Sequence, residues 1–137
     1  MDDVGYMPTN TGMPVMYDYG SHMSHKPMYE RLVKVIQDCE ATCEHMTTML
    51  KRRPDVQMRM RQLILLRDCA DICGLTAKFV ARNSIFSKHC AHLCAIICET
   101  CGRECARFPD MESQQCAQIC LNCARECQAF AGMQGMM

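Results

Sequence analysis

The sequence predicts an all-α fold, an antiparallel up-down-up-down bundle of four helices. Three observations lead to this class. Apolar residues and cysteines recur at helical spacing through four long segments. Prolines and capping residues separate these segments by short connections, which make consecutive helices antiparallel neighbours. The sequence shows neither the alternating pattern of strands nor the Asn-Gly and Asp-Gly pairs of hairpin turns.

The first helix is expected to begin at Pro27, because proline suits the first turn of a helix. Basic residues from Lys51 onward, followed by Pro54, are typical of its end. Its inward-facing stripe is expected to be Leu32, Val35, Ile36, Cys39, Cys43, Met46 and Leu50. Residues 1–26 contain prolines and glycines without a helical period, so they are predicted to form a flexible tail that contains methionine and histidine.

The second helix is expected to be capped by Asp55 and to run to about Asn83. Its inward-facing residues are expected to be Met58, Gln62, Leu65, Leu66, Cys69, Cys73 and Val80. Asn83 or Ser84 then caps a third helix, from about residue 85 to residue 108, which Pro109 ends.

The fourth helix is expected to be capped by Asp110 and to end near Ala131, before Gly132. Residues 27–131 therefore form one bundle domain, and residues 132–137 are predicted to be a flexible methionine-rich tail.

Charge and hydropathy exclude some classes of binding partner. Fifteen basic and fifteen acidic side chains balance, which argues against binding to nucleic acid or to an anionic membrane. No stretch is apolar for the roughly 18 residues that a transmembrane helix needs. The polar start without a signal peptide predicts a cytoplasmic protein, and the alternative is an exported protein whose leader has been removed.

The most informative feature is the placement of the thirteen cysteines, since each has another cysteine three or four residues away. Residues at this spacing are neighbours on a helix surface. The pattern therefore predicts one row of sulfurs on each helix, made by Cys39 and Cys43, by Cys69 and Cys73, by Cys90, Cys94, Cys98, Cys101 and Cys105, and by Cys116, Cys120, Cys123 and Cys127. The last two rows lie in an internal repeat, residues 94–108 and 116–130, which align without gaps.

Rows of thiols on core-facing stripes indicate a soft metal, and Cu(I) is the ion that thiolates and thioethers select. Four rows facing one axis would hold several Cu(I) ions between paired thiolates, which predicts a non-catalytic storage and detoxification protein for copper homeostasis. A copper chaperone or a small thiol is the expected donor. Cysteines as core filler and a disulfide scaffold are the less favoured readings, because packing does not demand sulfur and the count is odd.

Two other functions stay open. Zinc and iron–sulfur sites also use paired cysteines, although normally in loops rather than inside helices. A thiol redox enzyme would use Cys98 with Cys101 or Cys120 with Cys123, but such motifs need an exposed cysteine at a helix N-terminus, next to strands.

Weaker ligands for Cu(I) gather near the first hairpin turn, where they predict an uptake site. These are His45, Met46, Met49 and Met58. The alternative is that the methionines fill the core and that His45 is a solvated surface residue.

With these rows, the chain resembles the bacterial copper storage proteins over about residues 28–131. The motifs that carry the resemblance are Cys39-x-x-x-Cys43, Cys69-x-x-x-Cys73 and the two long rows. The resemblance implies a homotetramer of bundles filled with Cu(I), held by paired core thiolates, with methionine and histidine ligands at an open mouth.

Overall fold

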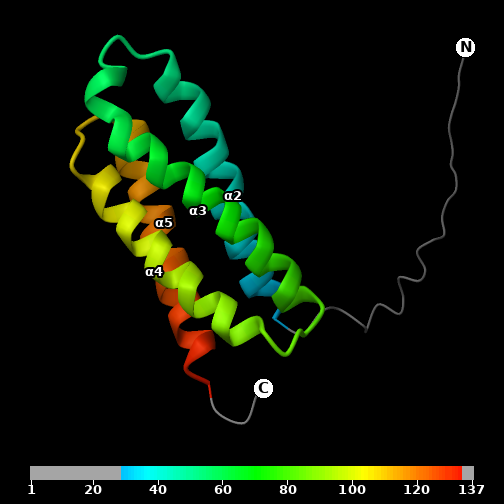
Figure 1. Ribbon diagram of the computed structural model, residues 1–137. Coiled ribbons are helices and arrows are strands. Elements are labelled where there is room, and N and C mark those ends of the chain that lie inside the picture. Colours follow the sequence, from blue (N-terminus) through cyan, green and yellow to red (C-terminus); the bar gives the residue numbers. More distant parts are fainter. Residues whose placement is uncertain (1–28, 134–137) are drawn as a thin grey trace, which may run out of the picture.

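The computed structural model describes residues 29–133, which form a bundle of four long helices. They are α2 (Glu30–Lys51), α3 (Met60–Ala81), α4 (Ser87–Ala106) and α5 (Met111–Ala131), and a short 3-10 helix, η3 (Val56–Arg59), precedes α3. The long helices alternate in direction around one axis (Figure 1). The described residues contain no strand, and the predicted all-α bundle is confirmed. The predicted N-terminal tail, residues 1–26, and residues 134–137 of the predicted C-terminal tail lie outside the described residues.

Helix α2 follows the predicted stripe closely. Leu32, Ile36, Met46 and Leu50 are buried with the two cysteines of this helix, and Val35 is half-buried at the edge of the stripe. The helix ends at Lys51, before Pro54, as the basic residues and the proline predicted.

The start of α3 differs from the prediction. Asp55 does not cap the helix; its carboxylate pairs instead with Arg53 Nε at 2.8 Å and Arg59 Nε at 3.2 Å. The chain then forms η3, which is wound more tightly than an α-helix. The prediction had extended the α-helical period of 3.6 residues backwards from Cys69, and η3 interrupts this period. Met58 was predicted to face inward, but it lies in η3 and is 77% exposed. Leu65, also predicted to face inward, is only half-buried.

The third and fourth predicted helices are confirmed with small shifts at their ends. Helix α4 begins at Ser87 rather than near residue 85 and ends at Ala106 rather than at residue 108. The prediction that Asn83 or Ser84 caps this helix is wrong, because Phe86 occupies the N-cap position without a side-chain cap. Asn83 takes a left-handed conformation (φ 54°) in the preceding turn, where the Ser84 hydroxyl accepts a hydrogen bond from the amide of Phe86. Asp110 caps α5 as predicted, since its carboxylate accepts a hydrogen bond from the amide of Ser113 at 3.0 Å.

Each helix packs against two neighbours, which closes the ring around the core. The order around the axis is α2, α3, α4, α5. Helices α4 and α5 approach closely at Gly102, where an added Cβ would lie 2.8 Å from Cγ of Leu121. A glycine inside a helix costs about 1 kcal/mol of stability relative to alanine. The close contact with Leu121 explains why a glycine nevertheless occupies position 102.

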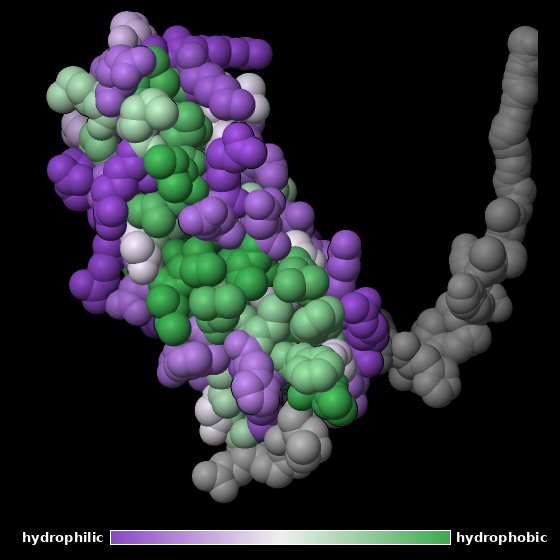
Figure 2. Space-filling view, viewed as in Figure 1, coloured by the Kyte–Doolittle hydropathy of each residue, from purple (hydrophilic) through white to green (hydrophobic). Residues whose placement is uncertain are grey.

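Two helices expose apolar side chains on the outside of the bundle. Figure 2 shows hydrophobic residues gathered over α3 and α4. Ile64 and Leu75 of α3 and Leu93 and Ile96 of α4 are all between 44% and 56% exposed. Among the described helices, none has the length together with the hydrophobicity needed to cross a bilayer.

Candidate metal centre

All thirteen cysteines project into the interior of the bundle. Twelve have an exposed fraction of 0%, and Cys90 is 9% exposed. They come from all four long helices. Every one of them is a free thiol. The predicted convergence of the four rows is therefore confirmed, and the core of this fold is lined with sulfur rather than stapled by disulfides.

The sulfur atoms follow one another along the bundle in a series that we call the thiol column. Within this column, the sulfur of Cys120 contacts more than two other sulfurs. Its Sγ is 3.6 Å from Sγ of Cys43, 3.9 Å from those of Cys39 and Cys116, and 4.0 Å from that of Cys101. One sulfur of α5 thus contacts sulfurs from α2, from α4 and from its own helix.

From Cys120 the column continues towards the turn between α3 and α4. Sγ of Cys39 lies 3.9 Å from that of Cys69, which lies 3.5 Å from Cys98. Cys73 then contacts Cys98 at 3.6 Å and Cys94 at 3.8 Å. The sulfurs of four helices therefore form a connected network without an intervening apolar layer.

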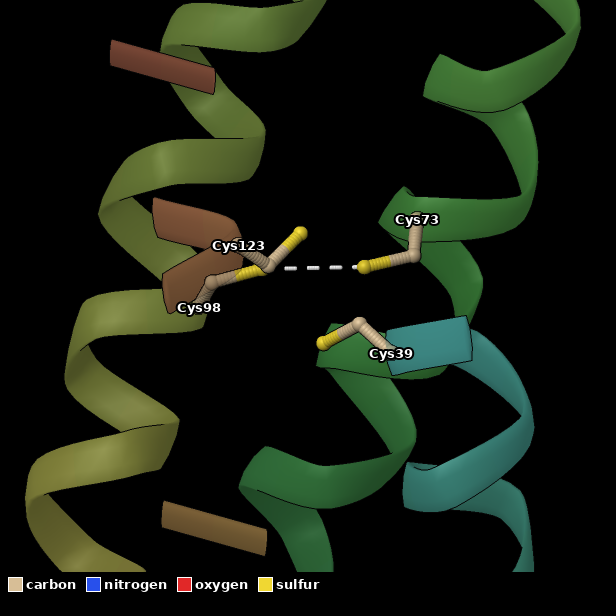
Figure 3. Close-up of side chains that lie close together, drawn as sticks. All are labelled: Cys39, Cys73, Cys98 and Cys123. Carbon is tan, nitrogen blue, oxygen red and sulfur yellow. Dashed lines mark hydrogen bonds between the residues drawn. The ribbon is translucent and has the colours of Figure 1, made fainter. Parts of the chain in front are cut away.

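Three groups of sulfurs are compact enough to surround a metal ion, with all members of a group within 4.8 Å of one another. The groups are Cys39, Cys73, Cys98 and Cys123; Cys39, Cys43, Cys69 and Cys120; and Cys94, Cys123 and Cys127. Figure 3 shows the first group, with one cysteine from each helix pointing into the space between them. Cys39 and Cys123 each belong to two groups, so neighbouring sites share sulfurs.

The helical spacing of the cysteines aligns each row, and the antiparallel direction of the helices decides which sulfurs meet. The repeated segments of α4 and α5 run in opposite directions. Cys101 therefore contacts Cys120 instead of Cys123, the residue that occupies its position in the repeat.

The profile of the family described as "Copper storage protein" matches residues 25–132, which include the whole bundle and every cysteine. The chain belongs to the copper storage protein family. This match confirms the family resemblance that the cysteine motifs indicated.

Solved structures of copper storage proteins share this fold. A Cu(I)-bound structure of the copper storage protein BsCsp3 aligns with a TM-score of 0.71 and 36% identity, over 75% of this chain and 97% of that one. The metal-free form of copper storage protein 3 from Bacillus subtilis gives a TM-score of 0.72 and 34% identity, over 77% and 100%. A cytosolic copper storage protein from Streptomyces lividans, with five coppers, gives 0.73 and 26%, over 77% and 92%.

A curated relative is similar in sequence. The uncharacterised cysteine-rich protein YhjQ of Bacillus subtilis (strain 168) is 39% identical over 79 residues, which are 57% of this chain and 72% of that protein.

The four predicted uptake residues of this copper storage family member differ in burial. Met46 is buried and Met49 half-buried, and both line a small cavity of about 40 Å³ between α2 and the start of α5. His45 and Met58 are exposed, and neither lines this cavity. Met46 and Met49 thus line one cavity, and the uptake site stays a prediction.

Two polar side chains that the sequence analysis did not identify as partners of the cysteines contact the thiol column. Gln62 donates a hydrogen bond from Nε2 to Sγ of Cys105 at 3.4 Å, and the Thr76 hydroxyl lies 3.0 Å from Sγ of Cys90. Both are fully buried. The available signal was their position, seven residues before Cys69 and three after Cys73, which puts polar atoms on a core-facing stripe.

The surroundings of several thiols favour the protonated form. Burial raises the pKa of Cys90 above its usual value, although the Thr76 hydroxyl opposes the shift. Hydrogen bonds from neighbouring thiols lower the pKa of other cysteines, such as Cys101, whereas such hydrogen bonds, together with burial, raise the pKa of Cys43, Cys98 and Cys120. These thiols therefore keep their protons at neutral pH until a metal ion displaces them.

Proposed function

We propose that this protein stores Cu(I) as cargo in its thiol column, several ions per chain, each held by thiolates from more than one helix. The single observation that carries the proposal is the set of thirteen buried, free thiols inside a closed bundle, most of them joined by sulfur–sulfur contacts of 3.5 to 4.0 Å. Membership of the copper storage protein family, and the Cu(I)-bound structure of a relative, support the same function. The role is sequestration, for homeostasis and detoxification, and involves no catalysis.

The sulfur spacing suits a low-coordinate ion. With metal–thiolate bonds of about 2.3 Å, the length typical of zinc, three sulfurs around one ion lie about 4.0 Å apart, and two on opposite sides lie about 4.6 Å apart. The contacts within the column are 3.5 to 4.0 Å, for example between Cys69 and Cys98 and between Cys101 and Cys120. Shifts of a few tenths of an ångström would therefore turn neighbouring thiols into ligands of one ion.

Sharing of sulfurs favours Cu(I) over zinc. A structural zinc site takes four ligands of its own in a closed tetrahedron. Cys39 and Cys123 each belong to two groups, so the groups cannot all be filled as separate tetrahedral sites. Bridging thiolates between soft ions resolve this, which supports a connected series of Cu(I) sites.

Burial argues against a thiol redox enzyme. Both Cys-x-x-Cys motifs lie inside helices, and the four sulfurs of Cys98, Cys101, Cys120 and Cys123 have an exposed fraction of 0%. A redox motif needs a thiolate that its substrate can reach.

We also propose how the bundles assemble and where the protein is located. The exposed apolar side chains of α3 and α4 support association of bundles into the homo-oligomer, a tetramer, that the family resemblance implies. Sedimentation equilibrium that returned the mass of one chain would oppose it. A cytoplasmic location is supported by the Streptomyces lividans relative, which is described as cytosolic, and a small thiol or a copper chaperone would supply the ion there.

An anaerobic titration tests the proposed function. The reduced protein is mixed with Cu(I) in the presence of a chromophoric Cu(I) chelator, and the absorbance reports the copper that the protein fails to take. We expect binding to continue well beyond two equivalents per chain, because a ladder of paired thiolates offers many sites. Saturation at one or two equivalents would rule out storage, and metal analysis of protein from copper-fed cells distinguishes copper from zinc and iron.

Copper binding is expected to weaken as the pH falls. The thiols with a raised pKa, such as Cys43, Cys98 and Cys120, carry protons at pH 7, so an ion that they bind releases protons. Release of one to two protons per ion changes the apparent affinity by about 10-fold to 100-fold per pH unit, with tighter binding at higher pH. Competition titrations between pH 6 and 8 measure this slope, and a slope of zero would mean that the ligand thiols are already ionised.

A further inference from the structure

Gln62 is a buried amide on the inward-facing stripe of α3, seven residues before Cys69. Seven residues make almost two helical turns, so the amide lies on the same face as the cysteine row of its helix. Its exposed fraction is 0%. A buried amide lowers stability unless its hydrogen bonds are made, whereas an apolar side chain carries no such requirement. The reason for an amide at this position therefore lies in what it contacts.

The orientation of this amide is fixed by Arg59. Oε1 of Gln62 accepts a hydrogen bond from Nη1 of Arg59 at 3.1 Å. Because a guanidinium only donates, the NH2 group of the amide cannot occupy this side. Nε2 therefore faces the other way, where it donates to Ser113 Oγ at 2.9 Å and to Sγ of Cys105 at 3.4 Å. The amide thus directs one N–H bond at a hydroxyl and the other at a cysteine sulfur.

Arg59 is itself held in place, and it is 2% exposed. Its Nε donates to Asp55 at 3.2 Å, and its Nη2 donates to Asp110 at 2.9 Å. Its guanidinium also stacks over the ring of Phe108, 4.1 Å from the centroid. Charge-assisted hydrogen bonds of this kind are stronger than neutral ones. The group that orients Gln62 is therefore rigid, as an outer-shell partner of a metal ligand needs to be.

Cys105 is a weak hydrogen-bond acceptor as a thiol and a strong one as a thiolate. The sulfur of a neutral thiol accepts hydrogen bonds weakly. Metal ions bind the thiolate, so a Cu(I) ion at Cys105 displaces the thiol proton. The hydrogen bond from Gln62 then becomes charge-assisted, and such bonds are roughly twice as strong as neutral ones. The amide is therefore better satisfied when this sulfur binds a metal ion.

We propose that Gln62 is a positioning residue for Cu(I), which tightens the site containing Cys105 through its hydrogen bond to that sulfur. This inference rests on the proposed function of Cu(I) storage, and it adds a residue that acts on the ion only through a ligand. Cys101 and Cys116, whose thiols interact with that of Cys105, would supply the other sulfurs of this site.

Gln62→Glu tests the hydrogen bond with little change in side-chain size. The carboxylate can still accept from Arg59, but it directs no N–H bond at Cys105, and its charge opposes a thiolate beside it. A chromophoric chelator buffers free Cu(I) over a series of concentrations without oxygen, and the copper retained by the reduced protein is measured. One bound ion is expected to need about 10-fold to 100-fold more free Cu(I) than in the wild-type protein, as is typical when an outer-shell partner is lost.

Gln62→Leu removes the donor without adding a charge. It is expected to shift the same ion in the same direction, by about tenfold. The matched control is Gln118→Glu, which makes the acidic substitution at an exposed position of α5. This control should leave the retention curve unchanged, because its side chain is not buried among the thiols.

The Cys105→Ala background separates positioning from a structural role. Without this sulfur the ion in question is lost, so the addition of Gln62→Glu should cause no further change in the retention of the remaining ions. Equal weakening in both backgrounds would show that Gln62 acts only on the packing of the bundle, and would overturn the proposal.

NMR observes the hydrogen bond in the wild-type protein, so this measurement does not depend on whether the variants fold. One of the Nε2 protons of Gln62 is expected to move downfield on copper loading, because its bond to sulfur strengthens. A folded Gln62→Glu variant with the wild-type retention curve, or Nε2 protons that copper leaves unshifted, would contradict the proposal. Failure of the storage function has a different signature, since the wild-type protein itself would then saturate after very few ions.

Discussion

Loading the protein with Cu(I) is expected to raise its unfolding temperature by at least about 20 °C. Ligands that bind only the folded state add about 4 kcal/mol per site at a thousandfold excess over the dissociation constant. Two filled sites already contribute about 8 kcal/mol, and each kcal/mol shifts the midpoint of a domain of this size by about 4 to 8 °C. Ions bound between sulfurs of different helices, for example between Cys39 and Cys120, would tie those helices together.

Scanning calorimetry or circular dichroism under anaerobic conditions measures this shift. Removal of the copper with a strong Cu(I) chelator in the presence of a reductant should restore the original midpoint. The metal-free bundle is expected to stay folded, because the metal-free relative from Bacillus subtilis has the same fold. A shift below about 5 °C would show that copper binds at the surface or to the unfolded chain, and would contradict storage in the core.

Replacement of Cys120 by alanine is expected to cause the largest loss of copper among single cysteine variants. Its sulfur lies within 4.0 Å of four others, those of Cys39, Cys43, Cys101 and Cys116. Removal of this one sulfur therefore disrupts several neighbouring sites at once. We expect Cys120→Ala to retain about two fewer Cu(I) ions and to bind the ions of this region at least 100-fold more weakly, more than the roughly 10-fold to 100-fold typical of changes outside the ligand shell.

Cys90→Ala is the matched control, since Cys90 belongs to none of the three compact sulfur groups. It removes one thiol by the same substitution and is expected to cost at most about one ion. The chelator competition titration compares the two variants, and circular dichroism establishes that both are folded. Equal losses would mean that each thiol binds copper independently and that sulfurs are not shared.

The candidate metal centre was largely predictable because the spacing of the cysteines along the sequence matches the period of an α-helix. Cysteines three and four residues apart share a helix face whatever the helix packs against, so Cys94, Cys98 and Cys101 align as soon as the segment is helical. The same reasoning correctly placed Met46 on the inward stripe of α2. It was wrong for Met58, because η3 interrupts the helical period before α3 begins.

The buried hydrogen-bond network around Arg59 was not predictable in this way. Gln62 was expected to face inward, but no local pattern indicated that Arg59, 54 residues before Ser113, would be buried against it. A buried arginine is stable only where carboxylates and polar groups from other segments meet its guanidinium. Asp55 was expected to cap a helix and instead serves this network.

By itself, the sequence determined the number and type of the helices, their approximate ends and the face on which each row of sulfurs lies, since these depend on spacing along one chain. Only the tertiary structure decided which sulfurs meet, such as Cys101 with Cys120. The register and rotation of one helix against another come from many contacts between distant segments, such as Gly102 against Leu121, and no single helix carries that information.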